Sequence, residues 1–266
     1  MAGSGNDFLV VENCPKMIWK SIAIKMCDRT EGIGADGVLV CDSSKIKDFR
    51  MRIINSDGSE AEMCGNGARC MAAYIARFKK VKKQYFSLET LAGEIIATAK
   101  DELATVKLTN PIDYIPKKKI KINSRQITVG SINTGVPHVI VPVHNLEEIN
   151  VKVLGSLIRY YKAFKPKGTN VNFVELIKND LIVVRTYERG VEDETKACGT
   201  GSVASAIISY LNFTDNKQQQ VNKAKMRVRT RGGEILQVCF DYNNGQIDNV
   251  WLKGSAKFIA KGEYYV

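Results

Sequence analysis

The sequence is poor in histidine and in the cysteine spacings that bind metals. It has only two histidines, His138 and His144, and no Cys-x-x-Cys pair. Structural zinc sites use four closely spaced Cys or His ligands, so no metal site is expected. The seven cysteines are an odd number scattered along the chain, which does not fit the disulfide framework of a secreted domain. Reduced thiols are therefore expected.

Long hydrophobic runs are also absent. No apolar stretch approaches the roughly 18 residues that a membrane span needs. The first residues, MAGSGNDFLVVEN, lack the basic and apolar regions of a signal peptide. A cytoplasmic protein that does not associate with membranes is therefore expected. At 266 residues, 44% of them hydrophobic, the chain is long enough for two globular domains.

The formal charge is +11, and lysines cluster at residues 79–83 and 116–121. Neither cluster is accompanied by a recognition helix, an aromatic RNA-binding pair or a zinc-finger spacing. Nucleic-acid binding is therefore not expected. A positive field of this kind can still attract a small anionic molecule.

Short strand-like runs dominate the chain and predict an α+β (α/β) fold. Helical patterns interrupt them at residues 16–27, 66–79, 151–163 and 200–212. In ARCMAAYIARF and SVASAIISYL, small and apolar residues occur on nearly every helix face. A helix of this composition is surrounded by protein. Each of these two is predicted to be the central helix of a strand-built shell.

An internal repeat defines the organisation further. CGNGARCMAAYIA begins at Cys64 and CGTGSVASAIISY at Cys198, while Arg52 and Arg185 lie twelve and thirteen residues upstream. Downstream, TLAGEIIAT (90–98) matches TRGGEILQV (230–238), and a weaker match pairs GNDFLVVE (5–12) with TNVNFVEL (169–176). Matches in the same order indicate a duplicated unit. The predicted halves are residues 1–110, completed by 255–266, and residues 111–254, with a linker at 111–124.

The pattern GIGADG (32–37) matches the glycine fingerprint of dinucleotide-binding proteins. That fingerprint follows a strand and begins a helix, whereas here a predicted helix precedes it and a predicted strand follows. No phosphate-binding GxxxxGK[ST] loop occurs either. Neither a nicotinamide nor a flavin cofactor is expected.

Each CGxG sequence places a thiol at the start of a predicted helix. The unpaired N–H groups and the helix dipole favour negative charge there, so a thiol with an ordinary pKa of about 8.5 can become a thiolate. The N–H groups of Gly65, Asn66, Gly199 and Thr200 can hold a substrate carboxylate. If the repeats face one another, Cys64 and Cys198 can act as base and acid on opposite faces of one carbon.

A buried cysteine is more often a small hydrophobic residue than a catalyst. That interpretation applies to the cysteines outside the CGxG repeats: Cys14, Cys27, Cys41, Cys70 and Cys239. Cys64 and Cys198 differ because both occupy the equivalent position of a repeat, before a glycine-rich helix start.

Long blocks of the sequence resemble the diaminopimelate epimerase family, in the family's order. They are GSGNDF (3–8), GIGADG (32–37), RIINSDGSEAEMCGNGARC (52–70), NTGVPH (133–138), GTNVNF (168–173) and YERGVEDETKACGTG (187–201). The resemblance implies two pseudo-symmetric domains, each a curved mixed sheet around a central helix. It further implies an isomerase that interconverts LL- and meso-diaminopimelate for lysine biosynthesis, without pyridoxal phosphate or metal, and a homodimer by analogy.

The resemblance also implies roles for individual residues. Cys64 and Cys198 match the acid and base. Ammonium and carboxylate binding is implied for Asn6, Asn55, Asn170, Glu188 and Arg189. Glu188 and His138 could instead orient the site. Gly37 and Val136 depart from the amides that some members carry, which reduces the predicted contacts to the far end of the substrate.

Two alternatives remain at this point. Proline racemase and hydroxyproline epimerase share the fold and a CGTG cysteine, but their first cysteine block resembles MCGHG, whereas this chain has MCGNGARC. The second alternative is a nonenzymatic amino-acid-binding protein, which would not need paired thiols.

Overall fold

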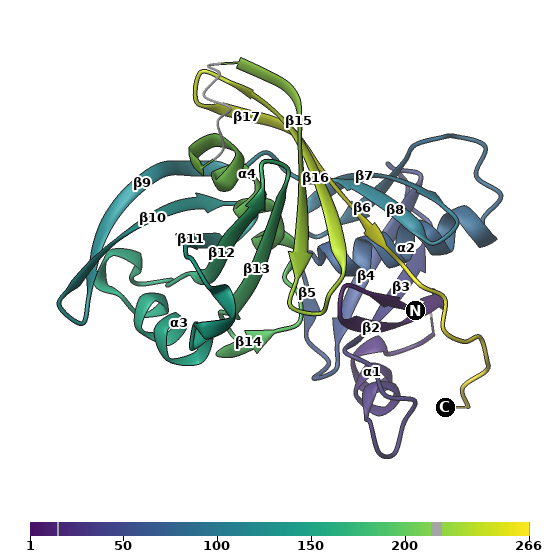
Figure 1. Ribbon diagram of the computed structural model, residues 1–266. Helices are drawn as coiled ribbons and strands as arrows, with labels where there is room; N and C mark the ends of the chain where they lie inside the picture. The colour runs from purple at the N-terminus through teal and green to yellow at the C-terminus, as the bar shows by residue number, and fades with distance from the viewer. Residues whose placement is uncertain (15, 214–219, 266) are drawn as a thin grey trace. The chain divides into compact units, whose positions relative to one another are not determined.

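The computed structural model describes residues 1–14, 16–213 and 220–265 (Figure 1). The chain forms two compact units, the first comprising Met1–Lys107 with Lys253–Val266 and the second Leu108–Leu252. Each unit combines mixed β-sheet with a buried helix, so the predicted α/β fold class is confirmed. Among the described residues, no helix combines the length and apolar character that a membrane crossing requires.

The described residues of Met1–Lys107 form eight strands and two helices. They are β1 (Ala2–Gly3), β2 (Asn6–Glu12), α1 (Trp19–Cys27), β3 (Gly37–Asp42), β4 (Phe49–Asn55), β5 (Glu60–Ala61), α2 (Gly65–Phe78), β6 (Phe86–Thr90), β7 (Gly93–Lys100) and β8 (Leu103–Lys107). Strand β2 is parallel to β3, which is antiparallel to β4. Strand β4 then pairs with β5 antiparallel and with β6 parallel, and β6 continues to β7.

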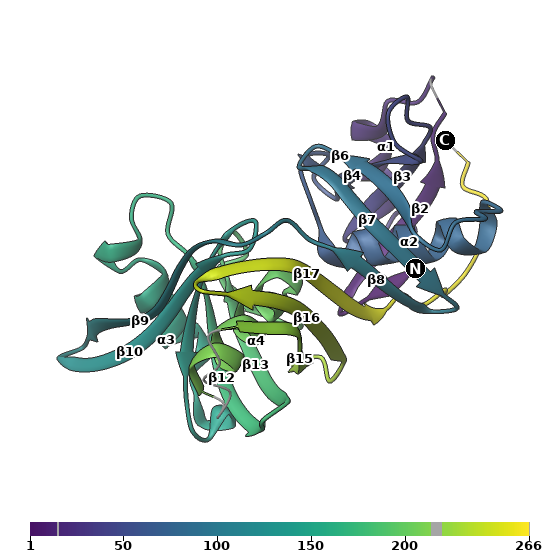
Figure 2. The same cartoon turned by 90° about the horizontal axis from the view of Figure 1, so that it is seen from above.

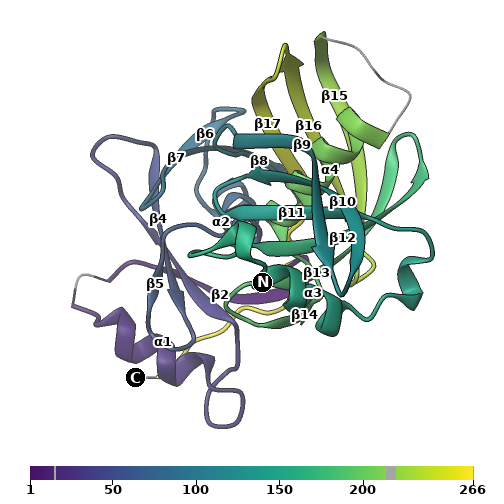
Figure 3. The ribbon, with the colours of Figure 1, turned by 90° about the vertical axis from the view of Figure 1, so that its left-hand side faces the viewer.

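The second unit repeats this order after a long hairpin of β9 (Ile112–Ile122) and β10 (Arg125–Asn133), visible in Figure 3. The remaining elements are β11 (Pro137–Pro142), α3 (Val151–Arg159), β12 (Asn170–Lys178), β13 (Leu181–Glu188), β14 (Asp193–Thr195), α4 (Gly199–Phe213), β15 (Gln220–Thr230), β16 (Ile235–Asn243) and β17 (Gln246–Ser255), with 3-10 turns at Leu146–Glu148 and Lys162–Phe164. Strand β17 crosses the boundary between the units.

The pairing pattern shows which elements of the two units correspond. Strands β11 and β12 are parallel, β13 is antiparallel to β12, and β13 pairs with β14 antiparallel and with β15 parallel. Thus β2, β3, β4 and β5 correspond to β11, β12, β13 and β14, and α2 corresponds to α4. The weak match of residues 5–12 with 169–176 is therefore wrong, because it pairs β2 with β12. Similar apolar strand patterns account for that match.

The predicted linker at 111–124 is also wrong. Most of its residues form β9, which pairs along its length with β10. Ile120 and Ile122 are buried, whereas Lys119 and Lys121, which alternate with them, are exposed. The alternation is that of a strand with one buried face. The lysine run and the two prolines hid this periodicity.

Helices α2 and α4 are buried, as their small apolar composition predicts. In α2 every residue from Gly65 to Ala73 is buried, and in α4 Val203, Ala204 and Ile207 have no exposed surface. Figure 2 shows α2 lying against the strands of its own unit, with β7 and β8 beside it. Both helices are therefore fixed in position, and so is the residue at the start of each.

Candidate active site

Cys64 is the N-cap residue of α2. Its backbone is extended, with φ −144° and ψ 115°, and its Sγ accepts a hydrogen bond of 3.4 Å from the N–H of Gly67. The side chain is half-buried. A sulfur that receives N–H donors at a helix start is stabilised as a thiolate. The structure therefore places the Cys64 thiol at the start of a helix, where the sequence predicts it.

A directional chain of hydrogen bonds fixes two of the predicted binding residues. The buried Arg69 donates to Ser4 and, over 2.9 Å, to Asn66 Oδ1. Asn66 Nδ2 then donates to Asn6 Oδ1 over 2.8 Å, and Asn6 Nδ2 donates to Asp36 over 2.8 Å. Because each amide oxygen faces a donor, the orientation of both amides is determined. Sequence reasoning missed Arg69, whose only signal was a cation within an apolar helix.

Asn55 lies at the same end of the sheet as Asn6. It ends β4 and stands opposite Gly37, which begins β3, while Phe8 of β2 stands opposite Gly37 on the other side. The side-chain amide of Asn55 donates to Ser59 Oγ over 2.9 Å. A Cβ at Gly37 would lie 2.8 Å from the carbonyl oxygen of Ile54, so the backbone would have to shift to take any side chain there.

Cys198 precedes α4 in the second unit and is 9% exposed. The N–H and hydroxyl of Ser202 donate to its carbonyl oxygen over 2.8 Å and 2.9 Å. Its Sγ lies 3.5 Å from the hydroxyl of Thr200. Thr200 was predicted to contribute its backbone N–H. The structure adds its side chain as a hydrogen-bond partner of the sulfur.

The buried His138 supports Thr200. Asn172 Nδ2 donates to the carbonyl oxygen of Val139 over 3.2 Å and lies 3.1 Å from His138 Nδ1, so Nδ1 accepts and the ring proton is on Nε2. Nε2 then donates to Thr200 Oγ1 over 3.0 Å. The hydroxyl proton of Thr200 is then available for a hydrogen bond to Cys198 Sγ. Burial, and next the charge of Arg189, lower the pKa of His138 to about 3, so the ring is neutral.

Three further predicted residues lie at the same end of the second unit. Asn170 begins β12, and its Oδ1 accepts a 2.8 Å bond from the N–H of Arg189. The guanidinium of Arg189 donates to the carbonyl oxygen of Lys167 over 3.2 Å. Glu188 ends β13 and is half-buried, and burial raises the pKa of its carboxyl group. Asn170 therefore holds the backbone at Arg189, directly after the end of β13.

Gly199 and Gly65 are the first residues of α4 and α2, where backbone N–H groups have no acceptor within the helix. The predicted residues thus form two clusters, one in each unit. The first contains Cys64, Gly65, Asn66, Asn6 and Asn55. The second contains Cys198, Gly199, Thr200, His138, Asn170, Glu188 and Arg189.

Three of the five other cysteines fit the interpretation as buried structural residues, whereas for Cys14, which is exposed, that interpretation is wrong. Cys27, Cys41 and Cys70 are buried, and burial raises the pKa of Cys27 and of Cys41 to about 11. Cys239 is half-buried on β16, where it accepts from Gln237 Nε2 over 3.4 Å. Cys14 is exposed. Thiols held in the protonated form by burial are poor bases and nucleophiles.

The glycine three residues after each cysteine gives the first mutational prediction. A Cβ on Gly201 would lie 2.4 Å from Asn172 Oδ1 and 3.2 Å from Cys198 Sγ, whereas on Gly67 the closest atom would be Leu39 Cδ2 at 3.0 Å. We expect Gly201→Ala to lower the free energy of unfolding by about 1–3 kcal/mol, and Gly67→Ala by less. Urea unfolding measures both. An equal or larger loss for Gly67→Ala would contradict the steric argument.

Comparison with known sequences identifies the family. A sequence profile described as Diaminopimelate epimerase matches residues 1–112 and 130–259. The chain belongs to the diaminopimelate epimerase family. The diaminopimelate epimerases of Aquifex aeolicus and Caldanaerobacter subterraneus are each 39% identical to it, over 98% and 99% of this chain and 95% and 97% of theirs. This member of the family is accordingly an isomerase that acts on a small molecule.

Solved structures show the same fold. A methylitaconate-delta-isomerase aligns with a TM-score of 0.67 at 10% identity, covering 98% of this chain and 92% of its own. A hydroxyproline epimerase from Agrobacterium vitis aligns with a TM-score of 0.64 at 15% identity, covering 89% and 77%. At such identities the likeness concerns the fold alone. The match to the diaminopimelate epimerase family therefore decides between the two enzyme families weighed from the sequence.

Proposed function

We propose that the chain interconverts LL- and meso-diaminopimelate by proton transfer between Cys64, Cys198 and the α-carbon, without a cofactor. Such an activity would supply meso-diaminopimelate for lysine biosynthesis. The observation that carries the proposal is the duplicated thiol. Each unit places one cysteine directly before a buried helix, among residues suited to binding an amino acid.

The chemistry balances with two thiols and no other reactant. One thiolate removes the α-hydrogen as a proton, so an S–H bond forms and the C–H electron pair remains on the α-carbon and its carboxylate. The opposite thiol then donates its proton to the other face and becomes the thiolate. Proton transfer between groups of matched pKa suits a reversible reaction between similar isomers.

Backbone N–H groups support this reaction in the proposal. The carboxylate gains negative charge when the α-proton leaves, and the helix starts at Gly65 and Gly199 offer N–H donors and a favourable dipole. Asn6, Asn66 and Asn170 are held in fixed orientations by the hydrogen bonds described above. Arg189 suits a carboxylate because a guanidinium can form paired hydrogen bonds.

The test is exchange of the substrate α-hydrogen in deuterated water. We expect the purified, reduced protein to exchange the α-hydrogen of LL- and meso-diaminopimelate and to convert each into a mixture of both. Mass spectrometry measures deuterium uptake, and chiral chromatography measures inversion. Proline is the matched control substrate. Exchange with proline and none with diaminopimelate would overturn the substrate assignment.

A further inference from the structure

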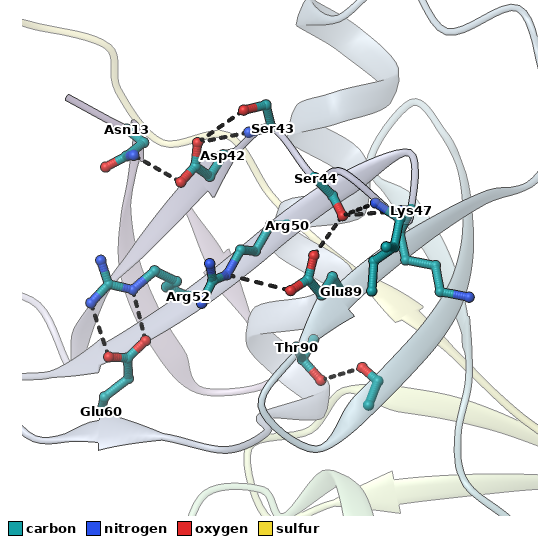
Figure 4. Close-up of polar contacts among 12 residues, drawn as sticks. Asn13, Asp42, Ser43, Ser44, Lys47, Arg50, Arg52, Glu60, Glu89 and Thr90 are labelled. Carbon is teal, nitrogen blue, oxygen red and sulfur yellow. Dashed lines mark hydrogen bonds and ion pairs between the residues drawn. The ribbon is translucent and has the colours of Figure 1, made fainter. Parts of the chain in front are cut away.

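Each unit contains an equivalent Arg–Glu ion pair, and neither pair includes a residue assigned to substrate binding. Arg52 Nε and Nη2 donate to the two carboxylate oxygens of Glu60 over 2.8 Å and 2.9 Å, as Figure 4 shows. Arg185 Nε and Nη2 donate to those of Glu194 over 2.7 Å each. The two pairs use the same atoms in the same forked arrangement.

Their positions in the fold also match. In each unit the arginine is on the strand that precedes the cysteine block, β4 or β13, and the glutamate is on the short strand after it, β5 or β14. Glu60 stands opposite Ile54 and Glu194 opposite Tyr187, in each case two residues beyond the arginine (54 − 52 = 187 − 185 = 2). Each glutamate lies four residues before its cysteine (64 − 60 = 198 − 194 = 4).

A second contact is duplicated two residues before each cysteine. The carbonyl oxygen of Glu62 accepts from the N–H of Ala92 over 3.2 Å, and that of Lys196 accepts from the N–H of Gly232 over 2.8 Å. Ala92 and Gly232 occupy equivalent places in the repeated TLAGEI and TRGGEI turns. The segment before each thiol is therefore held at two points.

These segments need such contacts because their regular structure is minimal. Strand β5 has two residues and β14 has three, and irregular backbone continues from each to the cysteine. A forked Arg–carboxylate pair fixes direction as well as distance. The Arg52–Glu60 pair, with each side chain 29% exposed, contributes little to stability, whereas Arg185 and Glu194 are 10% and 22% exposed. Duplication of such a pair in matching register therefore indicates a role in geometry.

We propose that Arg52–Glu60 and Arg185–Glu194 are positioning pairs that set the location of Cys64 and Cys198 at their helix starts. The inference rests on the proposed acid/base role of the two thiols. The second pair is the more rigid one, because Arg185 Nη1 also donates to the carbonyl oxygens of Leu146 and Ile149 over 3.0 Å each.

The test uses two variants, Arg52→Lys and Arg185→Lys, which keep the positive charge but cannot form the paired hydrogen bonds to the carboxylate. The readout is the pH dependence of alkylation by iodoacetamide, resolved for each cysteine by peptide mass spectrometry. We expect Arg52→Lys to move the midpoint of the Cys64 alkylation profile to higher pH and to leave that of Cys198 unchanged. We expect Arg185→Lys to move the Cys198 midpoint to higher pH and to leave that of Cys64 unchanged. The reason is that a displaced sulfur is less often within hydrogen-bonding distance of the N–H groups that stabilise its thiolate. We also expect kcat to fall about tenfold with KM changed less than about twofold.

Two matched controls come from the same strands or sheets. Arg50 is also on β4 and contacts Glu89 at 3.8 Å (Figure 4), and Arg227 forms a fork with Asp180 over 3.0 Å and 3.1 Å. Arg50→Lys and Arg227→Lys should change neither alkylation profile. The exchanged pair, Arg52→Glu with Glu60→Arg, keeps a fork and should restore most of the lost kcat.

Several outcomes would overturn the proposal: control variants that behave like Arg52→Lys, or one lysine variant that shifts both cysteines equally. If Arg185→Lys does not fold, the more exposed Arg52 pair decides alone. Alkylation needs no substrate. Cysteine-selective shifts without turnover of diaminopimelate would therefore refute the proposed function and leave the positioning pairs standing.

Discussion

Cys64→Ala and Cys198→Ala are each expected to lower kcat for diaminopimelate inversion by about 10³-fold or more. Each variant lacks one of the two groups that transfer a proton, and a positioned acid or base contributes about 10²–10⁴-fold by itself. Inversion needs both faces of the α-carbon, so neither thiol can replace the other. The measurement is the initial rate of meso isomer formation from the LL isomer, followed by chiral chromatography.

Cys239→Ala is the control, because Cys239 is half-buried on β16 and belongs to neither cluster. It should retain kcat within about twofold, the range typical of a substitution away from the site.

The two inactive variants should differ in one respect. Each keeps one thiol, so each should exchange the α-hydrogen of the stereoisomer whose hydrogen faces that thiol. Retention of a tenth of the inversion rate in either variant would contradict the mechanism.

The sequence predicts helices and longer strands well because burial leaves a periodic pattern. The small apolar residues of α2 and α4 and the β-branched runs of β3 and β13 are examples. Strands β5 and β14 escaped prediction because two or three residues are too few for any period. Strand β9 was obscured by lysines on its exposed face, and only the pairing with β10 reveals it.

For the two clusters, the sequence predicts the chemistry better than the supporting contacts. The CGxG repeat is sufficient to place a thiol at each helix start. The bond of Asn66 to Asn6 joins residues 60 apart, and that of Asn172 to His138 joins residues 34 apart, so both depend on the tertiary fold. The glutamates of the positioning pairs were detectable in principle, since both CGxG sequences carry Glu four residues upstream.

His138 shows how burial couples the second cluster to folding. Its ring is fully enclosed, accepts from Asn172 and donates to Thr200, so the neutral form is favoured and the pKa is lowered to about 3. In the unfolded chain a histidine has a pKa of about 6.5. Between these values the unfolded state binds one more proton than the folded state. The free energy of unfolding must therefore fall as pH falls through this range.

We therefore expect the stability of the parent protein to decrease below about pH 6.5 by up to about 1.4 kcal/mol per pH unit from this group, with no contribution above it. His138→Gln should lack this part of the slope, whereas His144→Gln, at an exposed histidine, should keep it. Urea unfolding between about pH 7.5 and about pH 4.5 at constant ionic strength measures all three proteins. Their difference isolates His138, because the carboxyl groups that also titrate in this range are common to each. Parallel plots of the free energy of unfolding against pH for the parent and His138→Gln would mean that the buried ring accepts a proton in the folded state. The donor and acceptor roles assigned from Asn172 to Cys198 would then be wrong.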